Sequence, residues 1–145
     1  MITVKQMLEE KGHQVWTVSP DSTVYEALKI MADREIGALI VVEGGQVVGV
    51  ISERDYARKV VLKGKSSLET PVKEIMTTQI YFVNPECTAE ECMALMTEKR
   101  IRHLPVIEEN KLIGVISIGD VVKSVITSQK ITIEHLQNYI MGKYQ

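Results

Sequence analysis

The sequence has little cysteine, no long apolar run and no excess of basic residues. Its two cysteines are Cys87 and Cys92, and the positions that match them in the repeat described below are not cysteine, so no repeated disulfide framework exists. Reduced thiols are typical of the cytoplasm, which is where we expect the protein. No stretch reaches membrane-spanning length, and the first residues do not resemble a secretory signal, which predicts no membrane association.

The charge balance and the missing motifs exclude several functions. With 17 Lys and Arg against 19 Asp and Glu, the net charge of -2 argues against a broad DNA- or RNA-binding surface. No phosphate loop of the Gly-x-x-x-x-Gly-Lys type occurs, and the three His and two Cys do not have metal-ligand spacing. No nucleophile lies beside a base in a recurring pattern. The sequence therefore indicates a protein that is not an enzyme and has no metal or resident cofactor.

What the sequence does contain is an internal repeat. Residues 15–61 align with residues 80–126 at a constant offset of 65, and 15 of the 47 positions are identical. Lead-in segments precede both copies, because residues 4–8 resemble residues 72–76. Repeated units that cannot bury their apolar faces alone pack against their copies. We predict a first repeat with its lead-in over residues 1–69, a second over residues 70–126, and a tail over residues 127–145.

Each repeat has the pattern of strand, helix, strand, strand and helix. The first helix begins at a Thr-x-x-Glu capping box, with apolar residues at helical spacing behind it. β-Branched runs separated by short turns predict a hairpin, and a second helix follows from about residue 53 to 62 and from about residue 118 to 126. We expect an α+β fold of tandem β-α-β-β-α repeats related by a pseudo-twofold axis. The expected capping boxes are Thr23 with Glu26, and Thr88 with Glu91.

A Ser-x-x-Asp segment recurs where each hairpin meets its second helix, at Ser52 to Asp55 and at Ser117 to Asp120. Free N–H groups at a helix N-terminus favour an anion, and the carboxylate could accept hydrogen bonds from the hydroxyls of a ribose. The same tetrapeptide is also a capping box in which Asp serves only its own helix. Both interpretations remain open from the residues alone.

A basic run precedes the hairpin of the second repeat. Lys99 and Arg100 complement the C-terminal dipole of their helix. Arg102 and His103 differ, because their counterparts Gly37 and Ala38 show that the fold does not require them. An Arg guanidinium suits a phosphate, and His103 is a second candidate for that role. The asymmetry predicts two unequal sites.

Taken together, the doubled Thr-x-x-Glu helix, the hairpin and the Gly-Val-Ile-Ser-x-x-Asp segment resemble a pair of CBS domains, the motif named after cystathionine β-synthase. The resemblance extends to about residue 126 and implies a free-standing module with two clefts between the repeats. It also implies that adenosyl ligands such as AMP, ADP or ATP bind there, with Asp55 and Asp120 holding the ribose. One cleft would join Asp120, Ser117 and Val115 to Ile36, Gly37 and Ala38. The other would join Asp55, Ser52, Val50 and Arg54 to Ile101, Arg102 and His103, with Thr77 or Thr78.

The resemblance also implies roles for the tail and the outer helix faces. The tail is expected to form a short amphipathic helix over residues 131–144, and paired modules of this type present flat helical faces to other chains. We therefore expect a homodimer. The tail's apolar side comprises Ile133, Leu136, Ile140 and Met141, and the candidates for the dimer contact are Val60, Val61, Val122, Val125 and Ile126.

The leading hypothesis is a regulatory sensor that binds an adenine nucleotide between the repeats and signals to an unknown protein partner. The alternative is a structural dimerisation module whose Ser-x-x-Asp turns are only helix caps. The two differ in whether a nucleotide binds and whether binding depends on Asp55 and Asp120.

Overall fold

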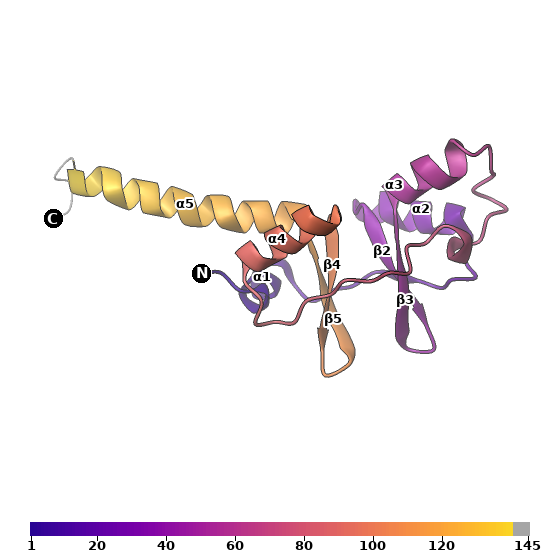
Figure 1. The fold of residues 1–145 in the computed structure, drawn as a ribbon, viewed down its shortest axis with the longest axis horizontal. Coiled ribbons are helices and arrows are strands. Elements are labelled where there is room, and N and C mark those ends of the chain that lie inside the picture. Colours follow the sequence, from indigo (N-terminus) through magenta and orange to yellow (C-terminus); the bar gives the residue numbers. More distant parts are fainter. Residues whose placement is uncertain (141–145) are drawn as a thin grey trace. The chain divides into compact units, whose positions relative to one another are not determined.

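The structure is a computed structural model that describes residues 1–140, apart from the side chains of residues 130–133 and 138–140. It consists of two compact units. Unit 2 is the continuous segment Gln14–Tyr81, whereas unit 1 combines Met1–His13 with Phe82–Gln145. Both units mix helices with strands, as Figure 1 shows, which confirms the α+β class.

Unit 2 contains a three-stranded sheet in the order β1-β2-β3, with two helices and two short helical turns. Strand β1 runs parallel to β2, and β2 forms an antiparallel hairpin with β3. The second helix of the repeat, expected over residues 53–62, begins as an α-helix and continues as a π-helix. The elements are β1 (Thr17–Val18), α2 (Val24–Arg34), β2 (Ala38–Glu43), β3 (Gln46–Ser52), α3 (Glu53–Tyr56), the π-helix η1 (Ala57–Val61) and the 3-10 helix η2 (Val72–Glu74).

Unit 1 repeats the hairpin and its flanking helices. Strands β4 and β5 are antiparallel, and the first strand expected in the second repeat is reduced to a single parallel bridge between Val83 and Val106. The lead-in forms a helix that was not predicted, with Thr3 and Gln6 as its capping box. The elements are α1 (Val4–Lys11), α4 (Ala89–Lys99), β4 (His103–Glu108), β5 (Lys111–Ser117) and α5 (Ile118–Ile140).

Turn chemistry fixes the two hairpins. The β2–β3 turn has Gly44 and Gly45 at φ of 58° and 77°, and the β4–β5 turn has Glu109 and Asn110 at 50° and 64°. Two successive residues at positive φ match the right-handed twist of the flanking strands. Glycine adopts this conformation without strain, whereas Glu109 does so at a cost.

The predicted capping boxes are complete in one repeat and half formed in the other. The Thr88 hydroxyl accepts a hydrogen bond from the Glu91 N–H, and the Glu91 carboxylate accepts one from the Thr88 N–H. The Thr23 hydroxyl accepts from the Glu26 N–H at 3.1 Å, but the Glu26 carboxylate does not return the bond. Both threonines also form an isolated antiparallel bridge to a lead-in, Thr23 with Pro71 and Thr88 with Thr3, so the bridge does not account for the difference.

The lead-in segments are exchanged between the repeats. Val72 and Ile75, from the second lead-in, belong to the hydrophobic core of unit 2. Val4 and Leu8, from the first lead-in, are buried in unit 1, where the Val4 N–H donates to the Cys87 carbonyl at 2.7 Å. The spatial units therefore differ from the predicted division at residue 69, which follows the order of the repeats along the chain.

A glycine in each hairpin makes room for the exchanged lead-in. A Cβ atom at Gly114 would lie 2.6 Å from Leu8 Cδ2, and one at Gly49 would lie 2.7 Å from Met76 Sδ. Real Cβ atoms do not approach other atoms so closely. Gly49 and Gly114 are equivalent positions of the repeat, so both units use the same close packing of lead-in on strand.

The second helix of the second repeat and the tail form one continuous helix. We expected the helix to end near residue 126 and a separate helix over residues 131–144, but α5 runs unbroken from Ile118 to Ile140 (Figure 1). No glycine or proline occurs between residues 120 and 140, so nothing in that stretch terminates the helix. Leu136 is 55% exposed, whereas Met141 and the side chains of Ile133 and Ile140 lie outside the described residues.

Candidate functional site

The Ser52 to Asp55 turn closes a capping box at the start of α3. Asp55 Oδ2 accepts hydrogen bonds from the Ser52 N–H at 2.9 Å and from the Ser52 hydroxyl at 3.1 Å. The Asp55 N–H donates back to Ser52 Oγ at 3.2 Å. Asp55 is one of two buried polar residues among those described, which is consistent with a carboxylate fully occupied by protein groups.

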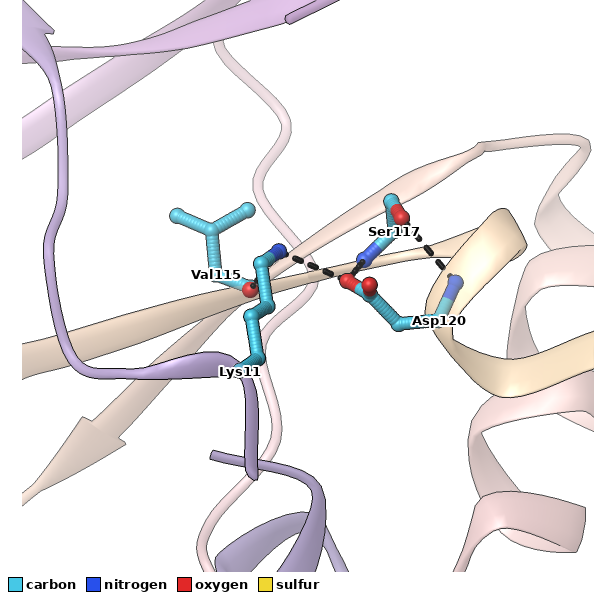
Figure 2. Close-up of polar contacts among 4 residues, drawn as sticks. All are labelled: Lys11, Val115, Ser117 and Asp120. Atoms are coloured by element: carbon cyan, nitrogen blue, oxygen red, sulfur yellow. Dashed lines mark hydrogen bonds and ion pairs between the residues drawn. The ribbon is translucent and has the colours of Figure 1, made fainter. Parts of the chain in front are cut away.

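The Ser117 to Asp120 turn has the same capping geometry at the start of α5. The Ser117 N–H donates to Asp120 Oδ2 at 2.8 Å, and the Asp120 N–H donates to Ser117 Oγ at 3.1 Å (Figure 2). The capping interpretation is therefore correct for both turns. The capping bond from the Ser117 N–H uses one acceptor site of Oδ2, and a carboxylate has about four such sites, so capping alone does not exhaust this carboxylate.

A lysine pairs with each of the two carboxylates, but the lysines come from different places. Lys59, four residues along the same helical segment, lies 3.1 Å from Asp55 Oδ1 and donates to the Ile75 carbonyl at 2.9 Å. Lys11, at the end of α1, lies 2.6 Å from Asp120 Oδ2 and donates to the Val115 carbonyl at 2.8 Å. Figure 2 shows the Lys11 ammonium between these two acceptors. Each lysine thus joins a Ser-x-x-Asp turn to a lead-in segment.

Electrostatics at Asp120 reflect this pairing. Partial burial raises the pKa of the Asp120 carboxyl, but hydrogen bonds from Lys11 and Ser117, together with the charge of Lys11, outweigh the burial. The net result is a pKa below the ordinary value for aspartate. Asp120 is therefore an anion at neutral pH, as both a cap and a hydroxyl acceptor require.

Unit 2 gathers one set of the predicted binding residues around Asp55. Ala38 pairs with Ser52 across the β2–β3 ladder, and the Glu53 N–H donates to the Gly37 carbonyl at 3.0 Å. Val50 and Thr77 exchange two backbone hydrogen bonds of 3.0 and 2.9 Å. The start of β2, the end of β3 and the second lead-in therefore meet at this turn. Ile36 precedes β2, Arg54 lies in the first turn of α3, and Thr78 is exposed next to Thr77.

Unit 1 gathers the other set around Asp120. His103 pairs with Ser117 across the β4–β5 ladder, and the Ile118 N–H donates to the Arg102 carbonyl at 2.8 Å. Arg102 is exposed, His103 is partly buried, and Ile101 lies directly before them. The two basic residues therefore share a unit with Asp120. The pairing across repeats that the family resemblance implies stays a prediction.

Two residues at these turns were missed by the sequence reasoning. Lys59 carries a weak signal, because a lysine four residues after Asp55 on a helix is in reach of its carboxylate. Lys11 carries no local signal, since it lies 109 positions from Asp120. Its only indication is that the first lead-in is three residues longer than the second.

The described residues hold no group of three or more His, Cys, Asp or Glu side chains that could bind a metal ion. Among them there is also no helix with the length and apolar character needed to cross a bilayer. What the two turns offer chemically is carboxylate acceptors, helix N-termini and nearby cations. That set suits a polar ligand with hydroxyl and anionic groups.

Comparison with known proteins places this arrangement in a family. The sequence matches the CBS domain twice, over residues 4–62 and 72–127. A solved CBS-domain protein from Burkholderia ambifaria MC40-6 superposes with a TM-score of 0.84 at 54% identity, covering 88% of this chain and 96% of that one. The mitochondrial CBS domain-containing protein CBSX3 of Arabidopsis thaliana is 40% identical over 98% of this chain and 73% of its own length. A hexameric CBS-CP12 protein from bloom-forming cyanobacteria superposes with a TM-score of 0.75 at 30% identity, covering 84% of this chain and 70% of that one.

The fold and the doubled turn define a module of two tandem repeats. The chain belongs to the CBS domain family and carries a pair of these domains. CBS-pair proteins are generally regulatory and often bind nucleotides, and chains built of CBS domains alone are typically not catalytic.

Proposed function

We propose that this chain is a regulatory sensor that binds an adenine nucleotide at its Ser-x-x-Asp turns and passes the change to a protein partner. The observation that carries the proposal is the recurrence of one arrangement in both units. In each, a carboxylate at a helix N-terminus lies beside the start of the neighbouring strand, and a lysine joins it to a lead-in.

Capping and ribose binding are compatible at one carboxylate. An ionised Asp offers about four lone-pair sites, and the cap of Asp120 uses Oδ2 alone. The vicinal hydroxyls of a ribose would donate to the carboxylate, and the helix N-terminus would favour the negative phosphate. At Asp55 both oxygens have protein partners, so a ribose must compete with Lys59, whereas at Asp120 the competing Lys11 pairs with Oδ2, the oxygen that the cap already uses. The structure of the turns therefore supports unequal affinities.

The remaining ligand groups would be met by residues around the turns. Apolar Ile36, Ile101 and the Val50 and Val115 positions would contact the adenine. Arg102, with His103 and Arg54, would contact the phosphates, because guanidinium groups match phosphate geometry. Ser52, Ser117, Thr77 and Thr78 would supply hydroxyls, and Gly37 and Ala38 would allow the backbone to approach the base. The protein itself would hold the nucleotide without turning it over.

Thermal unfolding with a panel of ligands tests this function. AMP, ADP, ATP, NAD(H) and S-adenosylmethionine are compared with guanine nucleotides, and a ligand at 100 times its dissociation constant should add about 2.7 kcal/mol to the free energy of unfolding. The variants Asp55→Asn and Asp120→Asn should each reduce the shift, and the double variant should remove it. Asp21→Asn is the matched control, because Asp21 is an exposed carboxylate that also pairs with a lysine. A panel in which no adenine ligand moves the transition would contradict the proposal.

A second proposed property is self-association, which is also the main alternative function. Val61, Val122 and Ile126 are 51%, 40% and 55% exposed, which suits burial against a second chain, whereas Val60 is in the core of its own unit and is no longer a candidate. A homodimer is the expected state, and the hexameric CBS-CP12 relative shows that other assemblies occur in the family. Light scattering of the parent and of Ile126→Lys tests this: a monomer in the parent would contradict it.

The place of action is proposed to be the cytoplasm. The related CBSX3 protein of Arabidopsis thaliana is mitochondrial, so relatives of this chain work in more than one compartment. Fractionation of the source cells, with detection by antibody, would identify the compartment.

A further inference from the structure

We propose that Lys11 is an internal competitor for the Asp120 turn: a nucleotide that binds there displaces the Lys11 ammonium from Asp120 and Val115 and thereby releases the C-terminal end of α1. This inference rests on the proposed function and adds to it how occupancy of one turn is sensed and read out. It concerns only residues of unit 1.

The first step is the position of the ammonium group. Lys11 Nζ lies 2.6 Å from Asp120 Oδ2 and 2.8 Å from the Val115 carbonyl oxygen (Figure 2). These are the carboxylate proposed to hold the ribose and the β5 segment proposed to contact the adenine. One side chain therefore occupies acceptor positions in two neighbouring parts of the proposed ligand site, so Lys11 and the ligand compete for them.

The second step is a comparison with the equivalent turn of unit 2. There the Val50 carbonyl, which corresponds to that of Val115, accepts from the backbone N–H of Thr77 at 2.9 Å. Main chain held in a two-way bridge cannot leave without unfolding the lead-in, whereas a lysine side chain leaves by rotating. Unit 1 thus has a displaceable group at the position where unit 2 has a fixed one.

The third step is the origin of the cation. In unit 2 Lys59 pairs with Asp55 from the same helical segment, but the equivalent position in the second repeat is Ser124. The second repeat has therefore no lysine of its own at this position, and Lys11 of the first lead-in provides the charge from another part of the chain. Pairing at Asp120 consequently depends on where α1 is, whereas pairing at Asp55 is local.

The fourth step links Lys11 to α1. Lys11 is the last residue of the helix, and the following residues also contact β5, since His13 Nδ1 lies 3.1 Å from the Ile113 carbonyl oxygen. The middle of α1 is held separately, by Leu8 packed on Gly114. Loss of the Lys11 contacts would therefore loosen the last turn of α1 while the buried part of the helix stays in place.

The exposure of the pair makes displacement feasible. The side chains of Lys11 and Asp120 are 38% and 26% exposed, so water and ions screen their attraction. We expect removal of the lysine to tighten nucleotide binding at Asp120 about tenfold, which corresponds to about 1.4 kcal/mol. Raised salt should reduce this difference between variant and parent, because it weakens the internal pair.

The test uses the full chain and the variants Lys11→Met and Asp120→Asn. Lys5→Met is the matched control, since Lys5 is on the same helix and its exposed side chain makes no hydrogen bond or ion pair with the described residues. Calorimetric titration with AMP and with ATP gives affinity and stoichiometry. Hydrogen exchange of the α1 amides is measured with and without the nucleotide.

The inference is supported if Lys11→Met binds AMP or ATP about tenfold tighter than the parent and Lys5→Met do. In the parent, the nucleotide should also speed hydrogen exchange of the amides in the last turn of α1. Without ligand, Lys11→Met and Asp120→Asn should already show that faster exchange. Nucleotide binding to the parent that is unchanged or weaker in Lys11→Met would overturn the inference and leave the proposed function standing. Unchanged α1 exchange in both ligand-free variants would overturn the release step. No binding by any variant would overturn the inference and the proposed function together.

Discussion

The packing of Leu8 on Gly114 predicts a strong coupling between two positions more than a hundred residues apart. Gly114→Ala would place a Cβ atom 2.6 Å from Leu8 Cδ2 and 3.0 Å from Cδ1. Overpacking of this kind costs about 1–3 kcal/mol of unfolding free energy. Leu8→Ala alone should cost about 2–5 kcal/mol, because Leu8 is 1% exposed and its loss leaves a cavity.

The double variant decides whether these atoms are in contact. With Leu8 shortened to alanine, the new methyl group at position 114 enters space that the leucine has vacated, so it should no longer destabilise the fold. We expect the loss in the double variant to be smaller than the sum of the single losses by about 1–2 kcal/mol, within the usual range for contacting residues. Urea unfolding of the parent and three variants measures the cycle.

Gly119→Ala is the control for the effect of adding a methyl group. Its Cβ would lie 3.6 Å from Ser117 Oγ, an ordinary contact, and Gly119 is in the first turn of α5. Replacing a helical glycine should stabilise by about 0.5–1 kcal/mol. Additive losses for Leu8→Ala and Gly114→Ala would refute the placement of the first lead-in on the second repeat.

Three further predictions concern single groups. Because the folded pKa of Asp120 lies below its ordinary value, its carboxylate contributes stability above about pH 3.9 that is lost as the pH falls through the folded pKa. In Asp120→Asn the free energy of unfolding should therefore fall less steeply at acid pH than in the parent. Equal slopes for the variant and the parent would contradict this prediction. Burial, with negative charge at Cys87, Glu91 and Glu90, raises the pKa of Cys92 to about 11. In the native state the Cys92 thiol should therefore react with disulfide reagents far more slowly than the Cys87 thiol. Equal labelling of the two cysteines, measured by mass spectrometry, would contradict this. Thr88→Ala should cost about 1 kcal/mol in urea unfolding, since it removes a complete capping box, and a neutral effect would show that the cap contributes nothing.

Local patterns predicted local structure well. The hairpins and the caps at Thr88, Ser52 and Ser117 depend on residues within a few positions of one another, so their chemistry is visible in the sequence. The continuous α5 was missed because the helix was expected to end with the repeat, near residue 126, although no glycine or proline stops it there. The half cap at Thr23 could not be read from the sequence, because the same Thr-x-x-Glu pattern occurs at both helix starts.

Long-range relationships could not be predicted in the same way. The predicted division of the chain at residue 69 followed the order of the repeats, but two similar repeats can each pack with either lead-in, and the sequence does not show which one. Tertiary contacts such as the packing of Leu8 on Gly114 and of Met76 on Gly49 distinguish these alternatives. Lys11 became visible as a partner of Asp120 for the same reason, since it reaches that carboxylate only when α1 packs on the second repeat.

The exchanged lead-ins also determine where the chain can be divided into fragments. A fragment ending at residue 69 would lack Val72 and Ile75, which belong to the core of unit 2. It would also carry α1 without the rest of unit 1, on which α1 packs. A fragment spanning Gln14–Tyr81 contains every segment of unit 2 in one uninterrupted piece. The segments of unit 1 lie on both sides of that piece, so the boundaries of the spatial units fall inside the repeats and not at their junction.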